Sequence, residues 1–240
     1  MPEAVIVAAA RSPIGRAFKG SLTSIRPDDL AAQIVTAALA QVPQLDPADI
    51  GDLILGCGLP GGEQGFNMAR VVAVLLGHDH LPGTTVNRYC SSSLQTTRMA
   101  FHAIRAGEGD AYISAGVECV SRFVKGSSDS LPDTKNPLFS DAEARAVFAA
   151  SGEAPPWHDP REDGLLPDVY IAMGETAENV AEKWKIGREE QDRFALESQR
   201  KAGEAVAKGA RVMLSTPPAI ATSASPVHTR RTASHTASSP

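Results

Sequence analysis

The chain has 240 residues, of which 42% are apolar, and a formal net charge of -5 at neutral pH. This composition predicts a soluble globular protein of one or two domains, and its acidity argues against nucleic acid or an anionic membrane as the main partner. Cys57, Cys90 and Cys119 are too few for a disulfide framework and lack the spacing of metal ligands.

The start of the chain, MPEAVIVAAARSPIG, contains an apolar run over residues 4–10. No basic region precedes this run, and it is too short for a secretory signal or a membrane span. We therefore expect a cytoplasmic protein. The same run has the length of a strand buried on both faces, and it ends at the turn-rich RSPIG.

Strands and helices then alternate along the first half of the chain. A helix is predicted from Pro27 up to Pro43, with further helices over 67–77 and 91–106. Strands are predicted over 52–57, 83–86 and 111–117, each as a short apolar or β-branched run. This alternation predicts an α/β fold with a mainly parallel sheet and helices on its faces.

The amino-acid composition changes after the last predicted strand. Residues 121–168 are rich in Ser, Asp, Pro and Gly and predict a partly irregular insertion, followed by helices over 173–185 and 188–209. In the segment 210–240, 21 of the 31 residues are Ala, Ser, Thr or Pro, so we expect disorder. His228 and His235 are expected to be solvated there, without a metal. We assign an α/β domain to 1–120, a loop domain to 121–209 and a low-complexity tail to 210–240.

The stretch VNRYCSSSLQTT, residues 86–97, places Cys90 between a predicted strand and a predicted helix. Unpaired backbone N–H groups and a partial positive charge at a helix N-terminus favour a thiolate. A strand, turn and helix also place such a side chain at the carboxyl edge of a sheet, where α/β folds bind their ligands. Free cysteines are also among the most buried residues. The spacing alone therefore leaves Cys90 open as a nucleophile or as a packed residue.

Four stretches carry a resemblance to a known family. NRYCSSSLQTTRMAFHAIRAGEGDAYISAGVECVS resembles the nucleophile segment of the thiolases, the acetyl-CoA acyltransferases, whose pattern is Asn-Arg-x-Cys-x-Ser, then a helix, a glycine and a strand ending in AGG-E-MS. VIVAAARSPIGRAFKGSL is similar to the family's opening strand and turn, and LGCGLPGGEQGFNMARVVAVLLG to its second strand and following helix. DVYIAMGETAENVAEKWKIGREEQDRFALESQRKA resembles its MG-TAENVA and R-EQD-FA--SQ-KA stretch. The resemblance covers residues 4 to about 209.

The resemblance implies a role for two residues. Cys90 would be the nucleophile that takes an acyl group from an acyl-CoA or a 3-ketoacyl-CoA as an enzyme thioester, with its own backbone N–H contributing to an oxyanion hole. Met173 would line the acyl pocket beside it. Cys57 and Cys119 match no catalytic position and are expected to be packed residues. His102 and His158 match no catalytic histidine.

The resemblance also implies the surroundings of the reaction. The family fold is a layered mixed sheet with buried helices and an irregular α-rich loop domain, in two similar halves. The implied partners are acyl-CoA and coenzyme A, as substrates and not as cofactors, in a homo-oligomer when intact, with no nucleic acid, membrane or metal. The implied setting is lipid metabolism, and Ala172, where some biosynthetic relatives carry histidine, favours fatty acid β-oxidation.

The resemblance stops after Gly209. The family's NEAFA, GHP-G and C-GGG motifs, which supply an oxyanion-hole asparagine, a histidine base and a second cysteine, do not occur. We therefore expect roughly the first half of a thiolase, with a truncation or a reading-frame change. The alternatives are a catalytic thiolase, a non-catalytic fragment and, least favoured, a β-ketoacyl synthase relative. A missing second half would expose the apolar face of the helix after Cys90, formed by Leu94, Met99, Phe101 and Ile104, and predicts association.

Overall fold

A computed structural model describes residues 2–123 and 134–208 of the chain. The low-complexity tail predicted over 210–240, with His228 and His235, lies outside the described residues.

Within the described residues, a sheet of three strands forms the centre of the first half. Its strands are β1 (Ile50–Gly56), β2 (Gly83–Val86) and β3 (Ala111–Gly116), in the order β2-β1-β3. Both pairings are parallel, and Gly56 at the end of β1 pairs with Val86 and Gly116 at the ends of its neighbours. The predicted α/β class and these three predicted strands are confirmed. The described sheet is wholly parallel, whereas the family resemblance implies a mixed one.

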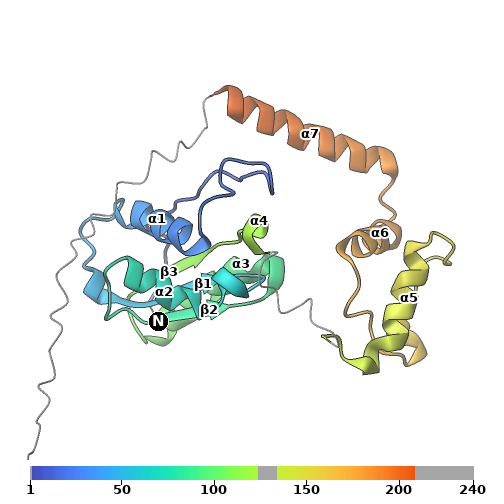
Figure 1. The fold of residues 1–240 in the computed structure, drawn as a ribbon, viewed down its shortest axis with the longest axis horizontal. Coiled ribbons are helices and arrows are strands. Elements are labelled where there is room, and N and C mark those ends of the chain that lie inside the picture. The colour runs from blue at the N-terminus through green and yellow to red at the C-terminus, as the bar shows by residue number, and fades with distance from the viewer. Residues whose placement is uncertain (1, 124–133, 209–240) are drawn as a thin grey trace, which may run out of the picture.

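Helices cover both faces of this sheet (Figure 1). α1 (Pro27–Leu39) and α2 (Met68–Leu75) pack on one face, and α3 (Ser92–Ala106) packs on the other against β1 and β3. Because successive strand residues point to opposite faces, alternate residues of β1 meet the first pair of helices. The core on that side includes Leu53, Leu55, Met68, Val72, Ala73 and Leu81.

The strand predicted over residues 4–10 is wrong. This segment has no regular secondary structure, and Val5, Ile6 and Val7 are 67%, 81% and 68% exposed. A strand needs the backbone of a neighbouring strand, and the described sheet does not extend to this segment. The side chain of Gln41 donates to the carbonyl of Ala9 at 3.0 Å instead. An apolar run indicates a tendency to be buried, but it does not supply a pairing partner.

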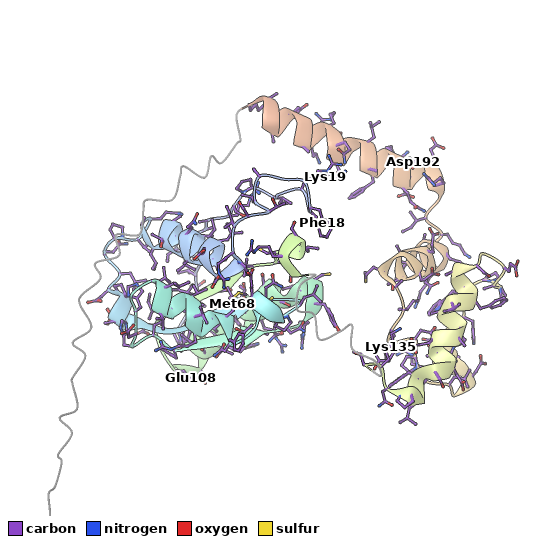
Figure 2. All side chains as sticks on the ribbon, viewed as in Figure 1. Phe18, Lys19, Met68, Glu108, Lys135 and Asp192 are labelled. Carbon is purple, nitrogen blue, oxygen red and sulfur yellow. The ribbon has the colours of Figure 1, made fainter. Side chains whose placement is uncertain are left out.

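Further along the N-terminal segment, the chain touches the region after β3. The backbone N–H of Phe18 donates to Oγ of Ser121 at 2.9 Å, and Ser121 lies in the short helix α4 (Val120–Phe123). Figure 2 shows Phe18 beside this helix. The first and last parts of the sheet domain are thereby joined.

The remaining helices lie apart from the sheet in Figure 1. They are α5 (Ser140–Ala150), α6 (Met173–Trp184) and α7 (Arg188–Ala207). The last two confirm the helices predicted there. α5 lies in the segment predicted to be partly irregular, and its Ala, Glu and Arg content explains a helix without a strong apolar stripe. No helix among the described residues is both long and apolar enough to cross a membrane.

Short 3-10 turns connect several of these elements. They span Pro47–Asp49, Gly62–Gln64, Tyr89–Ser91, Pro137–Phe139 and Pro160–Asp163.

Candidate active site

Cys90 lies on a tight connection between β2 and α3. The strand ends at Val86, a 3-10 turn occupies Tyr89–Ser91, and α3 begins at Ser92. The thiol is therefore within the turn that leads into the helix, and its residue is exposed. Since the strands are parallel, the turn lies at their common carboxyl edge, as the sequence predicts.

The turn before Cys90 is held in a strained conformation. Tyr89 has a φ of 45°, in the left-handed region that a tyrosine rarely adopts. Its N–H donates to Oδ1 of Asn87 at 2.8 Å, and its carbonyl accepts from Oγ of Ser92 at 2.6 Å. The same Ser92 hydroxyl accepts from the N–H of Arg88 at 2.9 Å. Such a conformation costs about 1–3 kcal/mol, and these three bonds offset that cost.

Two glycines allow α3 to start close to the sheet. A Cβ on Gly56 would lie 2.7 Å from the backbone of Ser92 and Ser93, and a Cβ on Gly116 would lie 1.9 Å from Oγ of Ser93. Both glycines end strands that pair side by side. The absence of side chains at these two positions therefore allows the start of α3, and with it the Cys90 turn, to lie close to the ends of the strands.

Hydroxyl groups fix the first turns of α3 to β3. The hydroxyl of Ser114 lies 2.9 Å from the hydroxyls of both Thr96 and Thr97. Thr96 is fully buried and also donates to the carbonyl of Ser93 at 2.8 Å. These bonds resist sliding of the helix along the sheet.

Cys90 lines a cavity of about 490 Å³, which we call the Cys90 cavity. Its walls come from the ends of β1 and β3 and from the start of α3. The lining residues are Gly56, Gly58, Leu59, Tyr89, Cys90, Ser92, Ser93, Gly116, Val117 and Glu118.

The other two cysteines differ from Cys90 in burial. Burial first, and then the nearby Glu118 carboxylate, raise the pKa of the Cys57 thiol to about 12. Burial also raises the pKa of the Cys119 thiol, against the lowering effect of Arg122. Both thiols are therefore kept in the neutral form at ordinary pH, which agrees with their prediction as packed residues.

Met173 begins α6 and is 70% exposed. It is not among the described residues that line the Cys90 cavity. Its role beside the acyl group stays a prediction.

His102 and His158 are not among the described residues that line the Cys90 cavity. His102 is on α3, edge-on to the ring of Phe101, and His158 lies near the carboxylates of Glu162 and Asp163. Within residues 2–123 and 134–208, no group of three His, Cys, Asp or Glu side chains could hold a metal ion.

Sequence reasoning missed the side chains that join the loops around the cavity. Glu118 accepts from the N–H of Gly58 at 2.7 Å and from the amide of Gln64 at 3.0 Å. These partners are 60 and 54 residues away along the chain. The one available signal is the glutamate of the AGG-E-MS pattern, which Glu118 matches.

One known family model spans both the sheet and the turn that carries Cys90. The family model described as "Thiolase, N-terminal domain" matches residues 4–213. The chain belongs to the thiolase family. The resemblance to the thiolases is therefore confirmed, and the nucleophile role that it implies for Cys90 stays a prediction.

Named thiolases are similar over most of this chain. It is 40% identical over 210 residues to a 3-ketoacyl-CoA thiolase of Bacillus subtilis (strain 168), covering 87% of this chain and 47% of that protein. It is 41% identical over 214 residues to a 3-oxoadipyl-CoA/3-oxo-5,6-dehydrosuberyl-CoA thiolase of Escherichia coli (strain K12), covering 87% and 50%. A beta-ketoadipyl-CoA thiolase of Pseudomonas knackmussii is 39% identical over 212 residues, covering 86% and 49%. The chain thus spans about half the length of these relatives.

Proposed function

We propose that Cys90 takes an acyl group from an acyl-CoA and passes it to coenzyme A or acetyl-CoA. The observation that carries this proposal is the exposed thiol on a strained turn, at the start of a helix and inside a cavity of about 490 Å³. Strained residues concentrate at functional sites, and a strand, sharp turn and helix is a common way to present a nucleophile. Membership of the thiolase family supports the same assignment.

The proposed step is the formation of a thioester on Cys90. The thiol first loses its proton to a base in solution, and the thiolate attacks the carbonyl carbon of the acyl-CoA. A new bond forms between Sγ and that carbon, the carbon–sulfur bond to coenzyme A breaks, and coenzyme A leaves as its thiolate. Attack of a second coenzyme A thiolate reverses this step, and no electrons are gained or lost. We assign to the backbone N–H of Cys90 the stabilisation of the oxyanion.

The names of the similar thiolases support a substrate class for the complete protein. We assign to the complete protein the thiolysis of a 3-ketoacyl-CoA or the condensation of acetyl-CoA, with Met173 beside the acyl group. Ala172 favours the degradative direction, and hence fatty acid β-oxidation in the cytoplasm. Acyl-CoA and coenzyme A are its substrates in this proposal, without a resident cofactor or metal, in a homo-oligomer that binds neither nucleic acid nor membrane.

A non-catalytic role is the second candidate. The described residues that line the Cys90 cavity include no histidine, so none of them is the usual proton acceptor for a thiol. In this case the chain binds an acyl-CoA weakly or pairs with another subunit. A β-ketoacyl synthase relative is a third and less favoured candidate, because the MG-TAENVA and SQ-KA stretches resemble thiolases.

Isotope exchange separates these candidates. The chain is incubated with acetyl-CoA and labelled coenzyme A, and the label in acetyl-CoA is measured over time. This exchange requires only formation and reversal of the thioester. The proposal predicts exchange by the parent chain and none by Cys90→Ala. Exchange equal to the buffer blank supports the non-catalytic candidate, and exchange with acyl carrier protein but not coenzyme A supports the synthase.

A further inference from the structure

Two polar side chains bridge the segments that follow β1 and β3. The carboxylate of Glu118 accepts from the N–H of Gly58 at 2.7 Å and from Nε2 of Gln64 at 3.0 Å. The amide of Gln64 also donates to the carbonyl of Leu59 at 2.8 Å, and its oxygen accepts from the N–H of Cys119 at 2.6 Å. We call Gln64 and Glu118 the clasp. Every polar group of the Gln64 amide has a partner, although the residue is only 1% exposed.

The clasp begins where the pairing of the sheet ends. The N–H of Cys57 donates to the carbonyl of Val86 at 3.0 Å, and the N–H of Val117 donates to the carbonyl of Gly56 at 3.0 Å. Beyond these bonds the two segments continue as loops, and the Glu118 carboxylate joins the loop after β3 to the loop after β1. The clasp therefore fixes backbone that the sheet itself does not hold.

One clasped residue lies beside the turn that carries Cys90. A Cβ on Gly58 would lie 3.4 Å from the backbone of Tyr89, at ordinary van der Waals distance, and both residues line the Cys90 cavity. Tyr89 is the strained residue directly before Cys90. A shift of Gly58 therefore changes the surroundings of a conformation that the chain does not adopt readily.

The segment that contains Gln64 is itself held from its outer side. Arg122 donates to both carboxylate oxygens of Glu63, at 2.6 and 2.7 Å, and Arg26 donates to the same carboxylate at 3.1 Å. Glu63 and Gln64 are adjacent, so the ion pairs limit the movement of the buried amide. Gln64 is thus held in place through the ion pairs of its neighbour Glu63.

We propose that Gln64 and Glu118 are positioning residues that hold the Tyr89–Cys90 turn in the geometry needed for acyl transfer. The inference rests on the proposed function of Cys90. Neither side chain is assigned a bond to the substrate. Their effect reaches the thiol through the backbone of Gly58 and Tyr89.

The test is the rate at which iodoacetamide alkylates Cys90, measured by peptide mass spectrometry on the full chain at one fixed pH. The variants are Glu118→Gln, Gln64→Glu and the double exchange that carries both. Each single change places two donors or two carboxylates face to face. We expect each to slow alkylation by on the order of tenfold, because a displaced turn moves Sγ away from the unpaired N–H groups at the start of α3. The double exchange restores a donor–acceptor pair and is expected to recover most of the rate, less the lost bond to Leu59.

A second variant separates position from charge. Glu118→Gln removes a negative charge as well as a hydrogen-bond acceptor. Glu118→Asp keeps the charge and shortens the side chain, so it is expected to be slow as well. Glu189→Gln, a matched change in α7, is expected to leave the rate as in the parent.

Thermal unfolding of each variant separates positioning from stability. Unchanged or faster alkylation in a folded Glu118→Gln or Glu118→Asp chain overturns the inference, as does a double exchange that recovers nothing. If either Glu118→Gln or Glu118→Asp does not fold, the other variant is used for the test. Absence of isotope exchange in the parent chain counts against the proposed function, and it does not alter the alkylation rates that test the clasp.

Discussion

At the scale of single residues, burial separates the chemistry of Cys57 from that of Cys90. The pKa of the Cys57 thiol is raised to about 12, first by burial and then by Glu118. At about pH 8, only about one part in ten thousand of such a thiol is ionised. Cys90 is exposed and lies at the start of a helix.

We predict that iodoacetamide at about pH 8 modifies Cys90 on the order of a hundredfold faster than Cys57. The measurement is the time course of each cysteine peptide by mass spectrometry. Unfolding the chain in guanidinium should make the two rates similar, because it removes the burial. Equal rates in the folded chain would contradict the assignment of environments.

Glu63 gives the ion pairs near the clasp a defined pH dependence. The hydrogen bonds from Arg122, and then its charge, hold the pKa of Glu63 below its ordinary value of 4.5. A carboxyl whose pKa is lowered by folding stabilises the fold above its unfolded pKa and loses this effect as the pH falls.

Glu63→Gln is therefore expected to lower the free energy of unfolding at neutral pH, with a difference from the parent that shrinks below pH 4.5. Chemical unfolding at a series of pH values measures this difference. The effect is expected to be small because the pair is partly exposed. A difference that is constant across the series would rule out the ion pair as its cause.

At the scale of elements, the depth of α3 depends on glycine at the ends of the strands. Gly56→Ala places a Cβ 2.7 Å from the backbone of Ser92 and Ser93, so the helix start must move. We expect a loss of about 1–3 kcal/mol in the free energy of unfolding, the usual cost of overpacking. Slower alkylation of Cys90 should accompany it.

The matched control is Gly203→Ala in α7, where a Cβ meets nothing within 4 Å. This change is expected to increase helix content slightly, since alanine is favoured over glycine by about 1 kcal/mol in a helix. Chemical unfolding and circular dichroism measure both variants. Equal effects of the two changes would argue against close packing at Gly56.

The elements around the site could be predicted from local patterns. Apolar runs and helix-start residues indicate β1, β2, β3 and the three helices that pack on them. The same reasoning fails at residues 4–10, because a run of apolar residues does not specify a pairing partner. It also misses the clasp, since Gln64 and Glu118 are 54 residues apart. The left-handed φ of Tyr89 has no local signal, because glycine and asparagine are the residues that usually mark it.

At the scale of the whole molecule, the described structure leaves apolar surface exposed. Leu94 and Phe101, which share a face of α3, are 71% and 44% exposed, and Met99 and Ile104 on the same helix are half-buried. Exposed apolar patches of this kind lead to association. This agrees with the expectation that the helix after Cys90 presents an apolar face.

We predict concentration-dependent association in sedimentation velocity. Leu94→Lys should shift the distribution toward the monomer, whereas Leu196→Lys, a change at a similarly exposed leucine in α7, should have less effect. A monomer at all concentrations, or equal effects of the two changes, would contradict a role for the α3 face.

The proposed activity requires that Cys90, on the turn before α3, accepts the acyl group. The mass of the folded chain is measured after incubation with acetyl-CoA and is followed by peptide mapping. We predict one acetyl group, located on the Cys90 peptide of the parent chain and absent from Cys90→Ala. An adduct that persists in Cys90→Ala, or a folded parent chain that gains no acetyl group, would contradict it.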